Sequence, residues 1–446
     1  MQTRTLTLTA RAGALLLVLI GAAAAPSAAQ LPNASTAALG MGNNYTAAAP
    51  GFGALAWNPA LLASSRNTYA SMTLLTTMGG AGIGPIELSD IADYSDRVVP
   101  DAVKRDWLSR VSPGDAERGT VNADLTLGAA QIGRFGLQVT SSVRTTADLS
   151  HDVLQLILFG NVDDEGDPAN LDFAGSSLDL AGYTTFAGAY AHPFEIMPGT
   201  RLLLGLTAKY TVGHIVVTGA DSQGSADASG FDIAFPIVNT VIDPDSFKLN
   251  NGGGFGFDVG AALEMGPLTL GASVENVVST FEWRMNDLRY RPLTLEAGEA
   301  ELIADTEEQP FDNAPAALRE HLENLDFGRS FKLGAAYQVR SNLLAAADLR
   351  HGSADGIVTG PTSHLGAGVE YRPTQSLPLR AGAAVIQLGD DNTGFQFGGG
   401  VGLNLGGWNL SASALQRHTD RFGGDAGARG KSRSLPCSGR PAARPA

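Results

Sequence analysis

The sequence predicts an all-β protein, a transmembrane antiparallel β-barrel of about 14 strands with a plug from its own N-terminus in the lumen. Three observations predict this fold. From residue 66 onward, long segments alternate between apolar residues and small or polar ones. The connections between these segments alternate between short and long. The segment that precedes them, residues 30–65, is apolar but too irregular to form a strand.

The alternating segments have the pattern of strands that cross a membrane. In residues 201–217, Leu202, Leu204 and Leu206 fall on one face, and the other face carries small, polar and charged residues. Strands of about ten residues with an apolar outer face and a polar inner face are typical of transmembrane barrels. A soluble β-sandwich also alternates, but its strands are usually shorter and its bulky face lies inside. The pattern therefore favours lipid outside and a wet lumen.

Thirteen segments of this kind can be counted along the chain. They are 66–77, 119–131, 134–147, 176–191, 200–217, 251–264, 267–283, 329–340, 342–353, 361–372, 378–388, 393–405 and 408–419. A single-chain bacterial barrel has an even number of strands, because both ends of the chain lie on the periplasmic side. Thirteen strands would also leave an unpaired edge in lipid. We therefore expect a fourteenth strand that is either lost or hidden in the pattern.

The connections sort into two classes. The short ones are 132–134, 192–199, 265–267, 340–342, 373–377 and 406–407, and the long ones are 78–118, 148–175, 218–250 and 284–328, with smaller loops at 354–361 and 389–393. Short periplasmic turns and longer outer loops are the expected asymmetry of such barrels. Within the long loops, residues 100–111 and 314–325 have the periodicity of short helices.

Residues 1–29 have the features of a secretory signal. Arg4 and Arg11 form a basic start, residues 13–25 an apolar core, and Ser27-Ala28-Ala29 a small-residue cleavage site. The apolar core is too short to span a bilayer as a helix. We expect a Sec-type signal peptide that is removed on export.

Composition argues against several classes of function. The 446 residues carry a formal net charge of −15 and contain one Cys, Cys437. An acidic chain does not suit nucleic-acid binding, and one Cys excludes a disulfide framework. The seven His residues lack the spacing of metal ligands, and no hydrolase motif occurs. We therefore expect no enzyme, no metal and no cofactor.

Residues 30–65 are expected to form the plug. No charged residue occurs between 34 and 62, and Pro50, Gly51, Gly53 and Pro59 interrupt any regular element. The backbone groups of such a segment still need hydrogen-bond partners, and a polar lumen supplies them. The alternative is a loosely ordered N-terminal arm.

Residues 421–446 differ in composition from the barrel segment, residues 66–420. They form a basic tail with six basic residues, one acidic residue and the only Cys. The expected fourteenth strand, which would close the barrel, should follow residue 420. One hypothesis is therefore that the reading frame has been altered in this segment. The alternative is a disordered basic tail.

Asn58-Pro59-Ala60, which follows Trp57, resembles the N-P-A motif of the outer-membrane long-chain fatty-acid transporters, the FadL-like family. The run 39–47 also looks like the mature N-terminus of that family and of its PorV-type relatives from secretion systems. The resemblance implies a 14-stranded barrel with an N-terminal hatch. The chain departs from the family at Pro50-Gly51 and at Leu61.

The resemblance also implies a function, passive uptake of hydrophobic small molecules across the cell outer membrane. An apolar ligand would arrive at the outer loops, where the apolar face of 100–111 would form a shallow groove, and would leave past the plug. The alternative is a PorV-like barrel in outer-membrane lipid that anchors secretion-system proteins and transports nothing. The residues expected to gate the plug are Trp57, Asn58, Pro59, Ala60, Gly40 and Gly42. For Asn58 and Pro59 a structural role stays open, because Asn can bond its own backbone two residues on and Pro fixes a bend.

Overall fold

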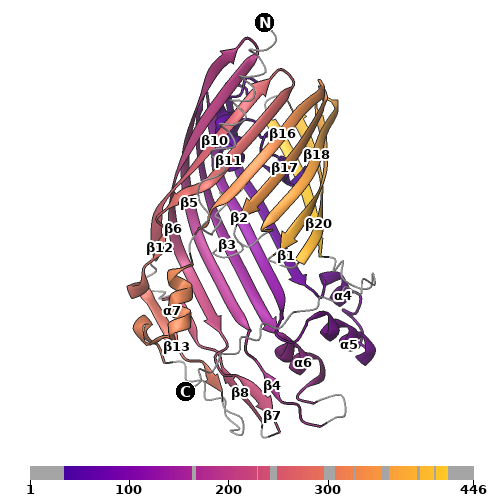
Figure 1. Ribbon diagram of the computed structural model, residues 1–446, viewed down its shortest axis with the longest axis vertical. Helices are drawn as coiled ribbons and strands as arrows, with labels where there is room; N and C mark the ends of the chain where they lie inside the picture. The colour runs from indigo at the N-terminus through magenta and orange to yellow at the C-terminus, as the bar shows by residue number, and fades with distance from the viewer. Residues whose placement is uncertain are drawn as a thin grey trace, which may run out of the picture.

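In the computed structural model, the residues described are 35–162, 167–228, 230–241, 249–295, 307–325, 327–352, 361–388, 392–405 and 408–419. They form thirteen long strands, each antiparallel to the next: β1 (Ala70–Gly84), β2 (Ala116–Ile132), β3 (Phe135–Ser150), β5 (Ser177–Met197), β6 (Thr200–Ala220), β10 (Gly252–Met265), β11 (Leu268–Ser279), β16 (Ser330–Arg340), β17 (Leu343–Gly352), β18 (Ser363–Thr374), β19 (Leu377–Leu388), β20 (Asn392–Leu405) and β21 (Trp408–Thr419). Figure 1 shows this sheet curled into a barrel. The predicted fold class, an antiparallel transmembrane β-barrel, is confirmed.

Smaller elements gather at the end of the barrel that carries the long loops (Figure 1). The helices there are α4 (Leu88–Ala92), α5 (Asp101–Arg110), α6 (His151–Phe159) and α7 (Ala316–Glu323), with 3-10 turns η3 (Met285–Asp287) and η4 (Phe311–Asn313). The short strands are β4 (Leu171–Asp172), β7 (Ser225–Asp227), β8 (Gly230–Ala234), β9 (Ile237–Thr240), β12 (Glu282–Trp283), β13 (Leu288–Arg291), β14 (Thr294–Leu295) and β15 (Gln309–Pro310). The outer loops therefore carry structure of their own, whereas the turns at the opposite end are tight.

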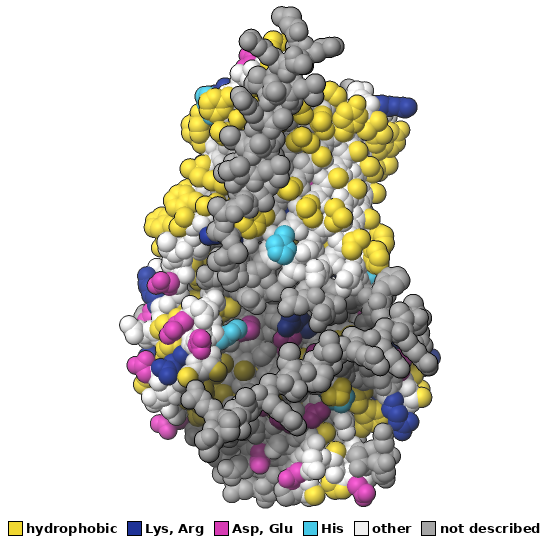
Figure 2. Space-filling view, in the orientation of Figure 1, with side chains coloured by type: hydrophobic (Ala, Val, Ile, Leu, Met, Phe, Trp, Pro, Cys, Tyr) yellow, Lys and Arg dark blue, Asp and Glu magenta, His cyan; other side chains and the backbone are white. Residues whose placement is uncertain are grey.

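The two faces of each strand differ as the alternation predicts. On β18, Leu365, Val369 and Tyr371 are exposed on one face, whereas His364 and Glu370 on the other face are buried. Figure 2 shows hydrophobic side chains gathered over the strands and charged ones over the loops. Because an apolar surface of this extent is stable only against lipid, the barrel wall spans a membrane.

Large exposed aromatic side chains lie near the short turns. They include Tyr69, Phe135, Tyr190, Tyr371 and Trp408, of which Tyr69 and Trp408 are exposed by 79% and 77%. Tyr and Trp favour the level of the lipid headgroups, where the ring is apolar and the polar tip reaches water. These side chains therefore mark one interface of the membrane.

The plug lies inside the barrel at the short-turn end (Figure 1). It consists of α2 (Thr36–Gly40), η1 (Gly51–Gly53), α3 (Ala54–Trp57) and η2 (Pro59–Ala63), joined by turns. Its apolar side chains form a buried cluster with small residues of the wall, among them Ala189 and Ala262. A loosely ordered arm would not be buried in this way, so the expectation of a plug in the lumen is confirmed.

Several predicted boundaries were wrong. The expected loop 78–118 begins only after Gly84, because the Gly-rich run 78–84 continues β1 and pairs with 118–124 of β2. The expected turn 192–199 is mostly strand, since β5 continues to Met197. Gly-rich or Pro-containing stretches lack clear alternation, but pairing with a neighbouring strand keeps them extended.

The predicted entry groove on residues 100–111 is also not present. The predicted helix is confirmed as α5, but Trp107 and Val111 are buried against Ile86 and Leu154 of the neighbouring loop and of α6. The apolar face that was expected to bind a ligand is used to pack the loops together.

The other predicted loop helix, 314–325, is confirmed as α7 and forms a cap at the loop end of the lumen. Leu318 and Leu322 pack with Tyr183 of β5, Val216 of β6 and the loop residue Phe327. His321 Nε2 lies 3.0 Å from Asp179 Oδ1 of β5. This hydrogen bond to Asp179 raises the pKa of His321 above its ordinary value, although burial acts in the opposite direction.

Docking of the α7 cap should depend on pH. A raised His pKa means that the contribution of the His321–Asp179 pair is fully present below the ordinary His pKa of about 6.5 and is lost as pH rises through the higher folded value. The protection of residues 316–323 against hydrogen exchange, taken relative to the intrinsic exchange rate at each pH, should therefore be higher at pH 6 than at pH 9. His321→Gln should show no such step, and an equal step in this variant would contradict the assignment.

The signal segment 1–29 and the tail 421–446 lie outside the described residues. Among the helices that are described, none has the length and apolar character needed to cross a membrane.

Candidate functional site

The plug is seated on a set of wall glycines, called here the glycine seat. Its members are Gly205, Gly260, Gly334, Gly366, Gly368, Gly382 and Gly398, on β6, β10, β16, β18, β19 and β20. A Cβ atom added at any of them would lie between 2.1 and 2.8 Å from an atom of the plug. The wall and the plug backbone can approach this closely only because these positions lack a side chain.

A buried carboxylate holds the middle of the plug. Asp348 of β17 accepts hydrogen bonds through Oδ2 from the backbone N–H groups of Tyr45 and Thr46, at 2.7 and 2.8 Å. Beside it, Asn44 Oδ1 lies 3.0 Å from His364 Nε2 of β18. The turn after α2 has no helical partners for these backbone groups, so side chains of the wall satisfy them.

Two cations of the wall lie close to the ring of Trp57. Its ring packs edge-on against Tyr45 at 5.9 Å, and Lys332 Nζ and Arg350 Cζ lie 4.9 and 5.3 Å from the ring centroid. Lys332 Nζ also donates to Ala56 O at 3.1 Å and to Glu275 Oε1 at 2.5 Å. The ring is 1% exposed. Cation–π attraction and hydrogen bonding therefore join the plug to β11, β16 and β17.

Asn58 connects the plug to the wall and caps η2. Its Oδ1 accepts from Ala60 N at 3.1 Å, the bond two residues on that the sequence suggests. Its Nδ2 donates to Ala261 O of β10 at 3.0 Å. Pro59 occupies the first turn of η2, where no N–H is needed. The structural role of Asn58-Pro59-Ala60 is thus visible in the geometry.

Two replacements of Asn58 should separate the contributions of the cap and of the bond to Ala261 to the stability of the protein. Asn58→Ala removes the cap and the bond to Ala261, and we expect it to lower the free energy of unfolding by about 1–2 kcal/mol. Asn58→Ser keeps a capping oxygen, but the Ser side chain is too short to reach Ala261. We therefore expect it to lower the free energy of unfolding by about half as much as Asn58→Ala does. Urea unfolding in lipid vesicles measures both, and equal losses would show that the cap contributes nothing.

Gly40 and Gly42 lie at the other end of the plug. A Cβ at Gly40 would lie 2.9 Å from Ser413 Oγ of β21, and one at Gly42 would lie 2.8 Å from Gly382 C. Gly42 also has a φ of +64°, which a residue with a side chain adopts at a cost. These two glycines pack against β19–β21, whereas Trp57–Ala60 face β6, β10 and β16. The six expected residues therefore lie in two contact regions between the plug and the wall.

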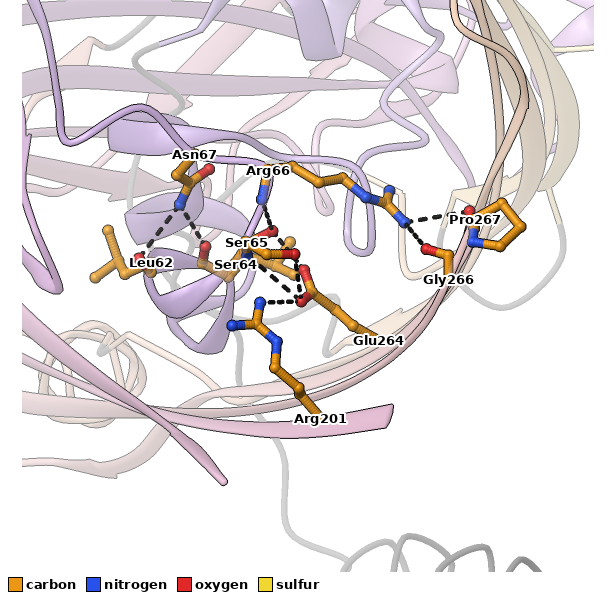
Figure 3. A network of polar contacts seen from close by, with 10 residues as sticks. Leu62, Ser64, Ser65, Arg66, Asn67, Arg201, Glu264, Gly266 and Pro267 are labelled. Atoms are coloured by element: carbon orange, nitrogen blue, oxygen red, sulfur yellow. Dashed lines mark hydrogen bonds and ion pairs between the residues drawn. The ribbon is translucent and has the colours of Figure 1, made fainter. Parts of the chain in front are cut away.

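A network of polar contacts fixes the C-terminal end of the plug where it leads into β1 (Figure 3). Glu264 of β10 accepts from Ser64 Oγ at 2.5 Å and Ser65 Oγ at 3.1 Å, and pairs with Arg201 of β6. Arg66 Nη2 donates to the carbonyls of Gly266 and Pro267 in the turn after β10. The plug therefore has a fixed point at the short-turn end.

A small chamber lies on the loop side of the plug. Its walls are aromatic, from Tyr183, Phe281 and Phe327, and its polar part includes Lys209 and Thr185. The cavity measures about 20 Å³, which is room for about one water molecule. The space between these side chains is therefore too small for a solute larger than water in this structure.

Two buried ion pairs separate the chamber from the plug. Along β10, Gly260 contacts the plug, Asp258 follows, and Gly256 and Gly254 line the chamber. Asp258 Oδ1 lies 2.6 Å from Lys209 Nζ, and the Lys332–Glu275 pair lies beside Trp57. A solute on this path would have to pass a charged layer as well as the plug.

Sequence analysis missed the wall residues that hold the plug. Asp348, Lys332, Glu275 and Glu264 are charged residues at positions that face the lumen. A charge at an inward position of a strand is a usable signal, because few such residues occur without a partner. No group of three or more His, Cys, Asp or Glu side chains suited to a metal is found within the described ranges.

Comparison with known proteins gives a partial match. Residues 59–277 match the model of a protein family described as a family of unknown function, DUF5723. No curated protein matches the chain significantly. The chain is not assigned to a family on this basis.

Solved structures with a similar chain trace include the following three proteins, all at low sequence identity. A Pseudomonas aeruginosa FadL homologue is 14% identical, with 89% of this chain and 92% of that chain covered and a TM-score of 0.45. The Pseudomonas putida toluene transporter TodX is 12% identical, covering 87% and 94%, with a TM-score of 0.43. The Ralstonia pickettii toluene transporter TbuX is 12% identical, covering 87% and 99%, with a TM-score of 0.40. The architecture rests on the strand pairings described above, because these TM-scores are low.

Proposed function

We propose that this protein is an outer-membrane barrel for passive uptake of hydrophobic small molecules past its N-terminal plug. The observation that carries the proposal is the plugged lumen with aromatic side chains on the loop side of the plug, Tyr183, Phe281 and Phe327, of which Tyr183 and Phe327 also pack with the α7 cap. Aromatic walls with a few polar groups suit a small apolar solute. The toluene transporters among the similar structures point to the same class of solute.

The gating residues remain those of the plug. Trp57 and Asn58 make the contacts that must break if the plug is to shift, and Gly40 and Gly42 allow its other end to slide against β19–β21. The contacts are hydrogen bonds, ion pairs and cation–π pairs, which can break and form again without unfolding the barrel. No observation specifically favours a PorV-like scaffold, so a secretion-system partner is not proposed.

Uptake tests this function. Bacteria that carry the protein in the outer membrane should take up radiolabelled toluene faster than cells without it, and deletion of residues 34–60 should raise the rate further and admit small polar dyes as well. Equal toluene uptake with and without the protein would refute transport. Uptake by the intact protein that does not change on deletion would refute gating by the plug alone.

A further inference from the structure

The rim of the barrel at the short-turn end has a step where the turn between β2 and β3 meets β5. The last backbone hydrogen bond across this step runs from Ala191 N to Arg134 O at 3.1 Å. Beyond it, residues 192–195 pair with β6 and, within the described part of the chain, with no other strand. Alternate residues of a strand turn their N–H groups to the same edge, so Pro193 stands where the next donor after Ala191 would be. Proline has no N–H, and the free edge is therefore not built to bind a further strand.

A row of rings covers the outer face of the wall at this step. The ring centroids of Phe135 and Tyr190 are 4.9 Å apart, those of Tyr190 and His192 6.4 Å, and those of His192 and Phe194 4.8 Å. Phe135, Tyr190 and Phe194 are exposed by 63%, 42% and 48%. Since exposed aromatic side chains near the short turns mark an interface of the membrane, this row lies at the level of the lipid headgroups.

The guanidinium of Arg134 reaches the same row. Its Nη1 lies 3.4 Å from His192 Nδ1, and the hydroxyl of Tyr190 lies 3.2 Å from that nitrogen. Because a guanidinium can only donate, Nδ1 accepts and the imidazole proton is on Nε2. Among the described residues, neither His192 Nε2 nor the other nitrogens of Arg134 have a hydrogen-bond partner, and no carboxylate pairs with Arg134. The nearest acid in the sequence, Glu195, lies on the other face of β5, opposite Arg201.

We propose that this step binds a phospholipid of the membrane leaflet at the short-turn end. Its phosphate accepts hydrogen bonds from the Arg134 guanidinium and from His192 Nε2, and its acyl chains lie on Phe135, Tyr190 and Phe194. Arginine suits phosphate because its planar donors match two of the phosphate oxygens, and charge-assisted bonds of this kind are strong. A basic group beside an apolar surface at headgroup level is the arrangement that recognises a lipid headgroup. The site lies on the outside of the wall and does not depend on passage through the lumen.

Lipid binding by the folded protein, purified in detergent from outer membranes, tests the site. Dioleoylphosphatidylglycerol is the probe, dioleoylglycerol has the same chains without the phosphate, and native mass spectrometry measures the affinity for the first lipid bound. Arg134→Gln should lower the affinity for phosphatidylglycerol about tenfold, and His192→Phe, which keeps a ring but no donor, should also lower it. Arg340→Gln changes an exposed arginine where β16 ends at the same end of the barrel, and should have no effect.

Three outcomes of this experiment would overturn the proposal. The first is an equal affinity of the parent protein for the two lipids, because the phosphate would then contribute nothing. The second is an equal loss in Arg134→Gln and Arg340→Gln, which would show a general effect of surface charge. The third is displacement of the lipid by excess inorganic phosphate, which would assign the site to a free anion.

A photoreactive side chain locates the bound lipid. In micelles that contain the two lipids in equal amounts, p-benzoylphenylalanine in place of Phe194 should crosslink to phosphatidylglycerol in preference to dioleoylglycerol, and Arg134→Gln should remove this preference. The same photoreactive residue in place of Tyr371, which is exposed on β18 near another short turn, should not respond to Arg134→Gln. A preference at position 194 that persists in Arg134→Gln would contradict the site.

Discussion

Gly398→Val is expected to displace the plug from its seat. A Cβ at Gly398 of β20 would lie 2.4 Å from Leu39 O and 2.6 Å from Gly42 N, and both are backbone atoms that cannot rotate away. Overpacking of this kind costs about 1–3 kcal/mol, and two further methyl groups place Val at the upper end. Urea unfolding should show this loss, and planar-bilayer recordings should show a larger conductance because the lumen is less well filled.

The neighbouring residue provides a matched control. Gly399 is exposed, and a Cβ there would meet no atom within 4 Å. Gly399→Val adds the same side chain to the same strand, and Val favours the extended conformation. It should therefore leave the conductance unchanged and the stability equal or slightly higher. If the two variants behave alike, close contact between plug and wall is not what holds the plug in place.

Lys332→Met is expected to have the largest effect on stability of the substitutions considered. Lys332 and Glu275 are both buried, and the substitution would leave the Glu275 carboxylate without its cation. Breaking one side of a buried ion pair typically costs about 3–5 kcal/mol. The plug would also lose the bond to Ala56 O and the cation beside Trp57.

The double variant Lys332→Met with Glu275→Gln separates charge from contact. A neutral pair removes the isolated charge, so more than half of the lost stability should return. The plug should remain looser than in the parent protein, because the contacts to Ala56 and Trp57 are still missing. Urea unfolding measures the first effect, and Trp fluorescence quenching by acrylamide measures the second. A double variant as unstable as the single one would contradict the role given to the ion pair.

Much of the fold could be predicted from period and composition. In β18 the residues Leu365, Val369 and Tyr371 were expected on one face and are exposed there. The β1 boundary was missed because Gly79, Gly80 and Gly82 have no side chains from which a period could be read. For the plug, the bond from Asn58 Oδ1 to Ala60 N was predictable, because it depends only on residues two apart.

The contacts that hold the plug could not be predicted in the same way. The bonds from Tyr45 and Thr46 to Asp348 join residues about 300 positions apart, and the partner of each plug group depends on strand register and barrel stagger. A register shift of one residue would turn Asp348 to the lipid. The same dependence hid the glycine seat, since the sequence does not distinguish a seat glycine such as Gly398 from its neighbour Gly399, at which an added Cβ would meet no atom within 4 Å.

By itself, the sequence determined that the chain forms long strands with one apolar face and that residues 30–65 belong to a different kind of structure. A period of two is a local property, and burial of one face follows from it directly. Only the tertiary structure decided which charged residues face the plug, that residues 100–111 pack against other loops, and that the expected gating residues lie in two separate contacts. These are contacts between distant parts of the chain, and they exist only once the closing of the sheet has brought those parts together.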